Sequence, residues 1–288
     1  MTCVTRFAPS PTGPLHLGHA FSALTAWERA RAGTFLLRIE DIDTPRCRPE
    51  WEAAIYDDLR WLGLTWTEPV MRQSDRTPAY RAALDRLAAL GVLYPCRCTR
   101  ADIRAAISAP QEGAEAPVYP GTCRGRTMTE AGPGDAIRLN LNAALARTGA
   151  VAFTETGPLH AGRHDAAAAL AQGDPVLARR DIGTSYALAV VVDDGAQGIT
   201  EVVRGADLFP ATAVQAILHA LLGQPCPAFH HHRLIRDDAG RRLAKRDDAR
   251  ALALYRAEGA TPDDIRRLVG LQPSGARIST SSPPRTAV

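Results

Sequence analysis

The stretch RFAPSPTGPLHLGHAFSAL, residues 6–24, constrains the fold of this chain more than any other part of its sequence. An apolar run ends at the start of this stretch, and a helical pattern begins near the end of the stretch. A loop rich in proline and glycine therefore joins a strand to a helix. Backbone N–H groups and the dipole at such a helix start attract an anion. His16 and His19 can both face that anion, and Gly18 between them allows its close approach. A proline-rich loop with a capping histidine is the alternative interpretation.

Strands and helices alternate in the first part of the chain, and this alternation predicts an α/β fold with a parallel sheet. Apolar runs at residues 3–8 and 34–40 are typical of buried parallel strands. Helical patterns occur at residues 18–32, 49–64 and 77–93, and the last two begin near a proline. A chain of 288 residues can form one large domain with an insertion, or two domains.

Residues 94–134 interrupt this alternation with many prolines and glycines and little periodicity, which predicts an inserted subdomain. Residues 273–288 have the composition of a disordered end. Between these segments the α/β pattern resumes, with strands predicted at residues 185–194, 199–205 and 228–235 and helices at residues 211–223, 248–259 and 262–271.

Two clusters of possible metal ligands are better explained as strand features. Asp193 and Asp194 end the apolar run of residues 185–194, and we expect them to open a turn after a strand. The three histidines at residues 230–232 lie in a predicted strand, where neighbouring side chains point to opposite faces. We therefore expect them at strand and rim positions.

Composition narrows the class of protein without deciding its function. No apolar run approaches the ~18 residues that a membrane-spanning helix needs. The N-terminal sequence MTCVTRFAPS lacks the layout of a signal peptide, so we expect a cytoplasmic protein with no membrane partner. The net charge of +3 is compatible with nucleic-acid binding but does not require it.

Four motifs, in order along the chain, resemble those of the class I glutamyl-tRNA synthetases. His16-Leu17-Gly18-His19 stands at the position of the HIGH signature of that family. LLRIEDIDTPR at residues 36–46 and ITEVVRGADLFPATAVQ at residues 199–215 are similar to two further stretches of the same catalytic domain, and RLAKR at residues 242–246 stands where the KMSKS loop belongs. The resemblance implies a Rossmann-type parallel sheet with an inserted zinc-binding, acceptor-type subdomain and a short helical C-terminal part.

The resemblance divides the chain into five parts. These are the first half of the Rossmann catalytic domain at residues 1–93, the zinc-binding insertion at 94–134, the rest of the insertion and the second catalytic half with the KMSKS-like loop at 135–250, short C-terminal helices at 251–272, and the tail at 273–288.

The chain resembles a truncated branch of that family. Only 43 residues follow Lys245, whereas a full-length enzyme continues into a helical domain that reads the anticodon. The resemblance therefore narrows to the glutamyl-Q tRNA(Asp) synthetases, which activate L-glutamate with ATP without tRNA and transfer it to queuosine in the anticodon loop of tRNA(Asp). It implies L-glutamate, ATP with Mg²⁺ and queuosine-bearing tRNA(Asp) as substrates, and we expect a monomer. Two alternatives stay open, a catalytic fragment of a two-chain glutamyl-tRNA synthetase and a non-catalytic paralogue that binds tRNA or glutamate.

Amino-acid activation is an in-line attack of a carboxylate on the α-phosphorus of ATP, so the site must position anions and stabilise charge. The resemblance gives catalytic and ATP-binding roles to His16, His19 and Lys245, and places Gly18 in the ATP site. Lys245 is present although Arg242 and Ala244 replace the lysine and serine usual in the KMSKS loop. The glutamate-binding residues that the resemblance implies, with two cations for carboxylates and one anion for the ammonium group, are Arg6, Ala8, Ser10, Glu40, Tyr186 and Arg204.

Cysteines in the predicted insertion indicate a metal site. Disulfides are rare in a cytosolic chain, so the close pair Cys96 and Cys98, followed by Cys123, favours metal binding over reduced cysteines with no ligand role. The resembling family binds zinc here through three cysteines and a tyrosine, and Tyr119 stands in the matching place. The resemblance thus implies one structural zinc ion per chain, held by four protein side chains.

Overall fold

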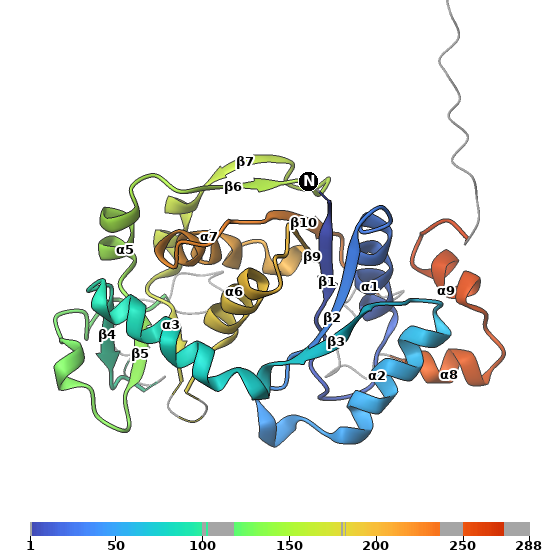
Figure 1. Ribbon diagram of the computed structural model, residues 1–288, viewed down its shortest axis with the longest axis horizontal. Helices are drawn as coiled ribbons and strands as arrows, with labels where there is room; N and C mark the ends of the chain where they lie inside the picture. The colour runs from blue at the N-terminus through green and yellow to red at the C-terminus, as the bar shows by residue number, and fades with distance from the viewer. Residues whose placement is uncertain are drawn as a thin grey trace, which may run out of the picture.

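The computed structural model describes residues 2–99, 102, 118–179, 181, 183–236 and 250–273. In this part of the chain, helices pack around parallel β-sheets. An antiparallel sheet lies at one end of the molecule, and the last two helices lie at the other end (Figure 1). The described helices include none that is both long and apolar enough to cross a membrane.

The first parallel sheet contains the predicted strands and one more. Strand β1 (Val4–Phe7) pairs in parallel with β2 (Thr34–Ile39), which pairs with β3 (Thr67–Arg72). Helix α1 (Leu17–Arg29) connects β1 to β2 and buries an apolar face, whereas α2 (Pro49–Trp61) and α3 (Thr77–Ala89) flank β3 in the sequence. The predicted alternation of strands and helices is therefore confirmed for this half.

The second sheet continues beside the first. Strand β9 (Glu201–Gly205) pairs in parallel with β10 (Ala228–His232), and β10 pairs in parallel with β6 (Ala152–Glu155), which forms a hairpin with β7 (Gly162–Asp165). Strand β9 lies beside β1, where the amide of Thr200 donates to the carbonyl oxygen of Val4 at 3.0 Å (Figure 1). The carboxyl ends of β1 and β9 thus meet at one edge, as in other open α/β sheets that bind ligands there.

The predicted strand at residues 185–194 is wrong, because this segment is helix α6 (Tyr186–Ala196). Its apolar residues lie on all sides and are buried between α3 and α7 (Ala211–Leu221), so the sequence lacks the one-sided pattern of a surface helix. A short apolar run cannot distinguish a buried strand from a buried helix. Asp193 and Asp194 do not open a turn; both are buried within α6.

The predicted strand at residues 228–235 is confirmed over Ala228–His232, but the rim position is wrong for His231. The side chain of His231 is 0% exposed because Glu155 of β6 and Arg204 of β9 satisfy both ring nitrogens. The histidines on either side of His231 are less enclosed, as alternation along a strand requires.

An antiparallel sheet follows the first parallel sheet in the sequence. It has the order β4 (Leu93–Cys96), β5 (Ala136–Leu139), β8 (Val176–Ala178), and helix α5 (Leu141–Thr148) follows β5. The antiparallel sheet extends beyond residue 134, the predicted end of the zinc-binding insertion, because β5 and β8 both lie after that residue. The chain then returns to the parallel sheet through α6.

Two short helices, α8 (Leu252–Ala257) and α9 (Pro262–Leu268), pack back on the first half of the chain. The amide of Leu252 donates to the carbonyl oxygen of Leu15 at 2.8 Å, and Arg266 of α9 forms an ion pair with Glu28 of α1. These contacts hold the predicted C-terminal helices against α1 and the loop that precedes it.

Candidate functional site

A cavity of about 510 Å³ lies where β1 and β9 end and α1 begins. Lys245 lies outside the described residues, so its place relative to the cavity stays a prediction. The other residues predicted to bind glutamate or ATP all line this cavity, although they come from distant parts of the chain: Arg6, Ala8, Ser10, His16, Gly18, His19, Glu40, Tyr186 and Arg204.

The start of α1 brings the rings of the two predicted histidines close together. His16 is the N-cap residue, and its Nδ1 atom accepts a hydrogen bond from the amide of Gly18 at 3.1 Å. The amide of His16 donates in return to Nδ1 of His19, and the ring centroids are 3.9 Å apart. His16 therefore caps the helix, as the alternative interpretation proposed, while both rings also line the cavity. A Cβ atom on Gly18 would lie 3.0 Å from Cε1 of His16, so glycine keeps this arrangement uncrowded.

Arg6 enters the cavity with its charge already balanced. Its Nε and Nη2 atoms donate to the two carboxylate oxygens of Asp194 at 2.9 and 3.2 Å. Arg38 of β2 donates to the same carboxylate at 2.7 Å and to Glu40 at 3.2 Å. Burial alone would raise the pKa of Asp194, but the two guanidinium groups outweigh it and hold the pKa at about 2.

Glu40, predicted to receive the ammonium group, lies at the end of β2 in the same network. Burial raises the pKa of its carboxyl group, although Arg38 and Arg6 oppose this shift. A substrate ammonium group placed against Glu40 would favour the ionised form, since an opposite charge lowers a carboxyl pKa. The site can thus receive an ammonium group beside a cation.

Arg204 differs from Arg6 in its partners. Its Nε atom donates to Nε2 of His231 at 3.0 Å, and its Nη2 atom donates to the hydroxyl of Thr212 at 2.8 Å. Nη1 lies 3.4 Å from the hydroxyl oxygen of Tyr186, the first residue of α6. All of these groups are uncharged when His231 is neutral, and no carboxylate of the described residues forms an ion pair with Arg204.

The sequence reasoning missed three groups that support the site, namely Asp194, Arg38 and His231. Arg38 sits in an apolar strand and is 0% exposed, and a buried charge needs a buried partner of opposite sign. That rule points from Arg38 to an acidic residue in another apolar segment, and Asp194 is such a residue. Nothing local pointed to the partners of His231.

Asp193, beside Asp194 in α6, faces the other way and joins different elements. Its carboxylate accepts hydrogen bonds from Tyr80 at 2.8 Å and Gln73 at 2.9 Å, and Arg76 donates to it at 3.2 Å. The adjacent aspartates therefore fasten α6 to the sheet on one side and to α3 on the other.

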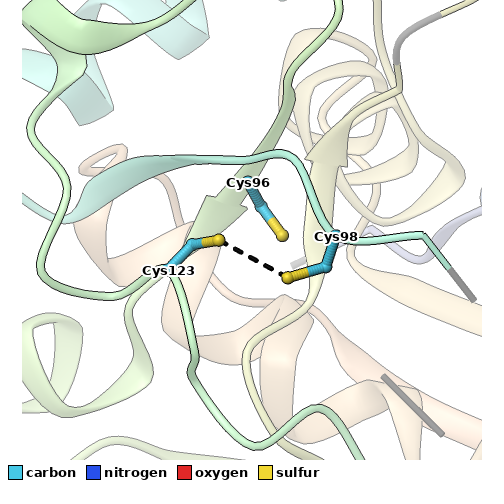
Figure 2. A group of neighbouring side chains, drawn as sticks. All are labelled: Cys96, Cys98 and Cys123. Carbon is cyan, nitrogen blue, oxygen red and sulfur yellow. Dashed lines mark hydrogen bonds between the residues drawn. The ribbon is translucent and has the colours of Figure 1, made fainter. Parts of the chain in front are cut away.

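The predicted zinc ligands lie together at the end of β4. The sulfur atoms of Cys96, Cys98 and Cys123 are within 4.8 Å of one another and point toward a common centre (Figure 2). The hydroxyl group of Tyr119 lies 3.5 Å from Sγ of Cys96 and accepts a hydrogen bond from the amide of Cys123 at 2.8 Å. Sulfurs that bind one tetrahedral zinc at ~2.3 Å are about 3.7 Å apart, so this cluster has a suitable size.

The matching family model is described as tRNA synthetases class I (E and Q), catalytic domain, and it covers residues 2–278. A glutamyl-Q tRNA(Asp) synthetase from Rhodobacter capsulatus is 59% identical, with 93% of this chain and 100% of that protein covered. A protein of the same name from Symbiobacterium thermophilum is 46% identical, with 90% of this chain and 83% of that protein covered.

The fold is similar to that of a solved glutamate tRNA ligase. The crystal structure of that enzyme from Elizabethkingia meningosepticum, in complex with its amino acid, has a TM-score of 0.72 and 26% identity. The match covers 94% of this chain and 61% of the ligase, so this chain spans less than two thirds of that protein.

We predict that Asp194→Asn destabilises the protein at neutral pH by about 3–5 kcal/mol, because it leaves two buried guanidinium groups with less opposing charge. The pKa of Asp194 falls from 3.8 to about 2 on folding, so its carboxylate stabilises the fold fully above pH ~4 and loses this effect as the pH drops toward 2. Urea unfolding of both proteins between pH 7 and pH 2.5 should show a difference that narrows below pH 4.

The exposed Asp57 of α2 provides the control, since Asp57→Asn removes a carboxylate that is 72% exposed. This variant should unfold within about 0.5 kcal/mol of the parent at every pH. A difference for Asp194→Asn that stays constant from pH 7 to pH 2.5 would contradict the charge-based explanation.

Proposed function

The chain belongs to the glutamyl-Q tRNA(Asp) synthetases, which share the class I catalytic domain, and we propose that it activates L-glutamate with ATP without tRNA and transfers it to queuosine in tRNA(Asp). One observation carries the proposal. Arg6, Arg204, Glu40 and the histidine pair of α1 converge on a single cavity, as a site for a dicarboxylic amino acid and a nucleotide requires.

The two arginines of the cavity and the carboxylate of Glu40 suit glutamate. We propose that Arg6 and Arg204 bind substrate carboxylates, because a guanidinium group can form two parallel hydrogen bonds to a carboxylate and favours it over a neutral amide. Glu40 receives the α-ammonium group, and Ser10 and Tyr186 add hydrogen bonds. Ala8 also lines the cavity, and its small side chain leaves the space open.

The start of α1 suits the phosphates of ATP. Backbone amides at a helix N-terminus attract anions, and we propose that His16, Gly18 and His19 hold the phosphate and ribose region there. Lys245 in RLAKR is proposed to neutralise charge on the leaving pyrophosphate, and Mg²⁺ arrives with ATP as part of the substrate.

The reaction needs positioning rather than a protein nucleophile. A glutamate carboxylate oxygen forms a bond to the α-phosphorus while the bond to the bridging oxygen of pyrophosphate breaks, which yields glutamyl-adenylate and pyrophosphate. A hydroxyl of the acceptor then attacks the acyl carbon, and AMP leaves. The residues of the cavity accelerate both steps by holding the reactants in line and by balancing charge.

Queuosine is a reasonable acceptor because its cyclopentenediol carries two cis hydroxyl groups, like the terminal ribose of an ordinary acceptor tRNA. The relatives named glutamyl-Q tRNA(Asp) synthetase match this chain at 59% and 46% identity, against 26% for the glutamate tRNA ligase. We place the reaction in the cytoplasm, where tRNA and ATP occur, and expect a monomer.

We further propose that Cys96, Cys98, Tyr119 and Cys123 hold one structural zinc ion. Four protein ligands would leave no open position, so zinc there would tie the segment around Cys123 to the end of β4. The spacing of the sulfur atoms and the nearby phenol of Tyr119 support this assignment.

We predict that Arg204→Ala raises the KM for glutamate about 100-fold in tRNA-free ATP–pyrophosphate exchange, because the variant removes a charged donor pair. The KM for ATP should stay within about threefold, since only the amino-acid site changes. Arg60→Ala, which removes an exposed guanidinium group on α2, should behave like the parent. A glutamate KM that is unchanged in Arg204→Ala would remove Arg204 from the site.

We predict that the acceptor is queuosine and not the 3′ end. tRNA(Asp) that carries queuosine but lacks its terminal adenosine should still accept radiolabelled glutamate, whereas tRNA(Asp) with guanosine at that position should not. Periodate, which cleaves cis diols, should abolish acceptance. Equal labelling of the guanosine form, or preferential labelling of tRNA(Glu), would instead favour a glutamyl-tRNA synthetase fragment, and absence of activation would favour a non-catalytic paralogue.

We predict about one zinc per chain in protein purified without chelator, by metal analysis of the intact chain. Cys98→Ser should release the metal and lower the thermal midpoint, with a smaller effect on exchange kinetics, because the cluster does not line the cavity. Cys226→Ser, at an exposed cysteine, is the matched control and should keep the metal. Protein that is folded and free of metal would contradict the assignment.

A further inference from the structure

Behind Arg204 lies a buried pair with no part in the proposed reaction. Nδ1 of His231 and Oε2 of Glu155 are 2.5 Å apart, and both side chains are 0% exposed. The other carboxylate oxygen of Glu155 accepts hydrogen bonds from the amides of Gly157 at 2.6 Å and His231 at 2.9 Å. Two backbone amides thus donate to one carboxylate oxygen of Glu155, and the ring of His231 lies against the other.

The two contacts of His231 define its protonation state. Nδ1 must carry the proton because it faces the carboxylate of Glu155. Nε2 must be an acceptor because Nε–H of Arg204 points at it from 3.0 Å. A protonated imidazole would place N–H against N–H, so the arrangement holds only for the neutral ring with hydrogen on Nδ1.

Among the groups packed around His231, Glu155 favours the charged ring, whereas burial, Arg204 and His160 oppose it. Glu155 comes from β6, Arg204 from β9, and Thr212 from α7 lies 3.3 Å from Nε2. Phe209 and Phe229 provide apolar walls, and His160 adds a weak like charge when protonated. Burial and the charge of Arg204 lower the pKa of His231 to about 4, so the ring stays neutral at physiological pH.

The contact with His231 fixes the guanidinium group of Arg204 without placing a carboxylate directly against it. Arg6 in the same cavity differs, because its Nε and Nη2 atoms donate directly to the carboxylate of Asp194. Arg204 is held at Nε by a neutral nitrogen, and the carboxylate of Glu155 lies beyond the imidazole ring. The guanidinium group is therefore fixed in direction while its Nη atoms remain close to the cavity lining.

We propose that His231, oriented by Glu155, is a positioning residue that aims Arg204 at a substrate carboxylate and thereby sets the affinity for glutamate. The inference rests on the proposed function, since it takes glutamate as the ligand of Arg204. It assigns a role to two buried residues that touch no substrate.

Two substitutions at one position separate this role from a purely structural one. In His231→Asn, the amide nitrogen can replace Nδ1 and keep the bond to Glu155, but no acceptor reaches Arg204. In His231→Gln, the longer amide places its oxygen near the position of Nε2 and keeps the bond to Arg204. Tight positioning of Arg204 therefore predicts a rise of about tenfold or more in the KM for glutamate with Asn, and a rise of less than about threefold with Gln.

The measurements are tRNA-free ATP–pyrophosphate exchange with glutamate and ATP varied in turn, and thermal unfolding of each protein. We expect the KM for ATP to stay within about twofold of the parent value, and both variants to unfold cooperatively. His230→Asn, on the same strand and outside the cavity lining, is the matched control and should leave both KM values unchanged.

Nitrogen-15 NMR of histidine-labelled protein tests the protonation state without any turnover. The signal lost in His231→Asn should belong to a ring with a protonated Nδ1 and an unprotonated Nε2 at pH 7. An imidazolium ring, or hydrogen on Nε2, would overturn the inference. So would equal kinetic effects of Asn and Gln, or a larger effect of Gln.

The outcomes also separate this inference from the function on which it rests. If the unaltered chain activates glutamate and His231→Asn binds it normally, the inference fails and the proposed function stands. If the unaltered chain shows no glutamate-dependent exchange, the proposed function fails and the inference fails with it.

Discussion

The ionic contact of Asp194 with Arg6 and Arg38 is the interaction on which the rest of the structure depends. It joins α6 to β1 and β2 across 188 and 156 positions of the sequence, at a place where all three side chains are buried. A buried carboxylate between two guanidinium groups is stable only when its geometry is kept, because each unpaired charge would face a strong desolvation penalty. The contact therefore defines where α6 lies against the sheet, and with it the position of Tyr186 at the edge of the cavity.

The two arginines of the cavity, Arg6 and Arg204, are held by different kinds of partner. Arg6 is part of the structural network and shares its charge with Asp194, whereas Arg204 is held by neutral groups and faces the same space. A single carboxylate placed beside Arg204 would have neutralised it, and an unsupported guanidinium group would sample many rotamers. Support through the imidazole of His231 avoids both outcomes, which suits the carboxylate-binding role that we propose for Arg204.

Much of the candidate site was predictable from sequence because its parts are local. The strand, the proline-rich loop and the start of α1 lie within residues 4–29, so turn chemistry and helix capping place His16, Gly18 and His19 with little help from distant segments. Cys96 and Cys98 are likewise close in the chain, and only Cys123 and Tyr119 had to be brought to them. Resemblance to a family supplied the roles, and the cavity brings the described members of that set together.

The sequence by itself determined the alternation of strands and helices, the capped start of α1 and the residue types of the proposed glutamate site, since these depend on local pattern and side-chain chemistry. Tertiary structure alone decided that residues 186–196 form a helix, that Asp193 and Asp194 point to different partners, and that His231 is buried between Glu155 and Arg204. A segment that is buried on every side is apolar at nearly every position, so its sequence shows neither a helical nor a strand period. Periodicity therefore could not identify α6. The protonation state and charge balance of a buried group depend on neighbours that come from other strands and helices, and those neighbours exist only once the chain has folded.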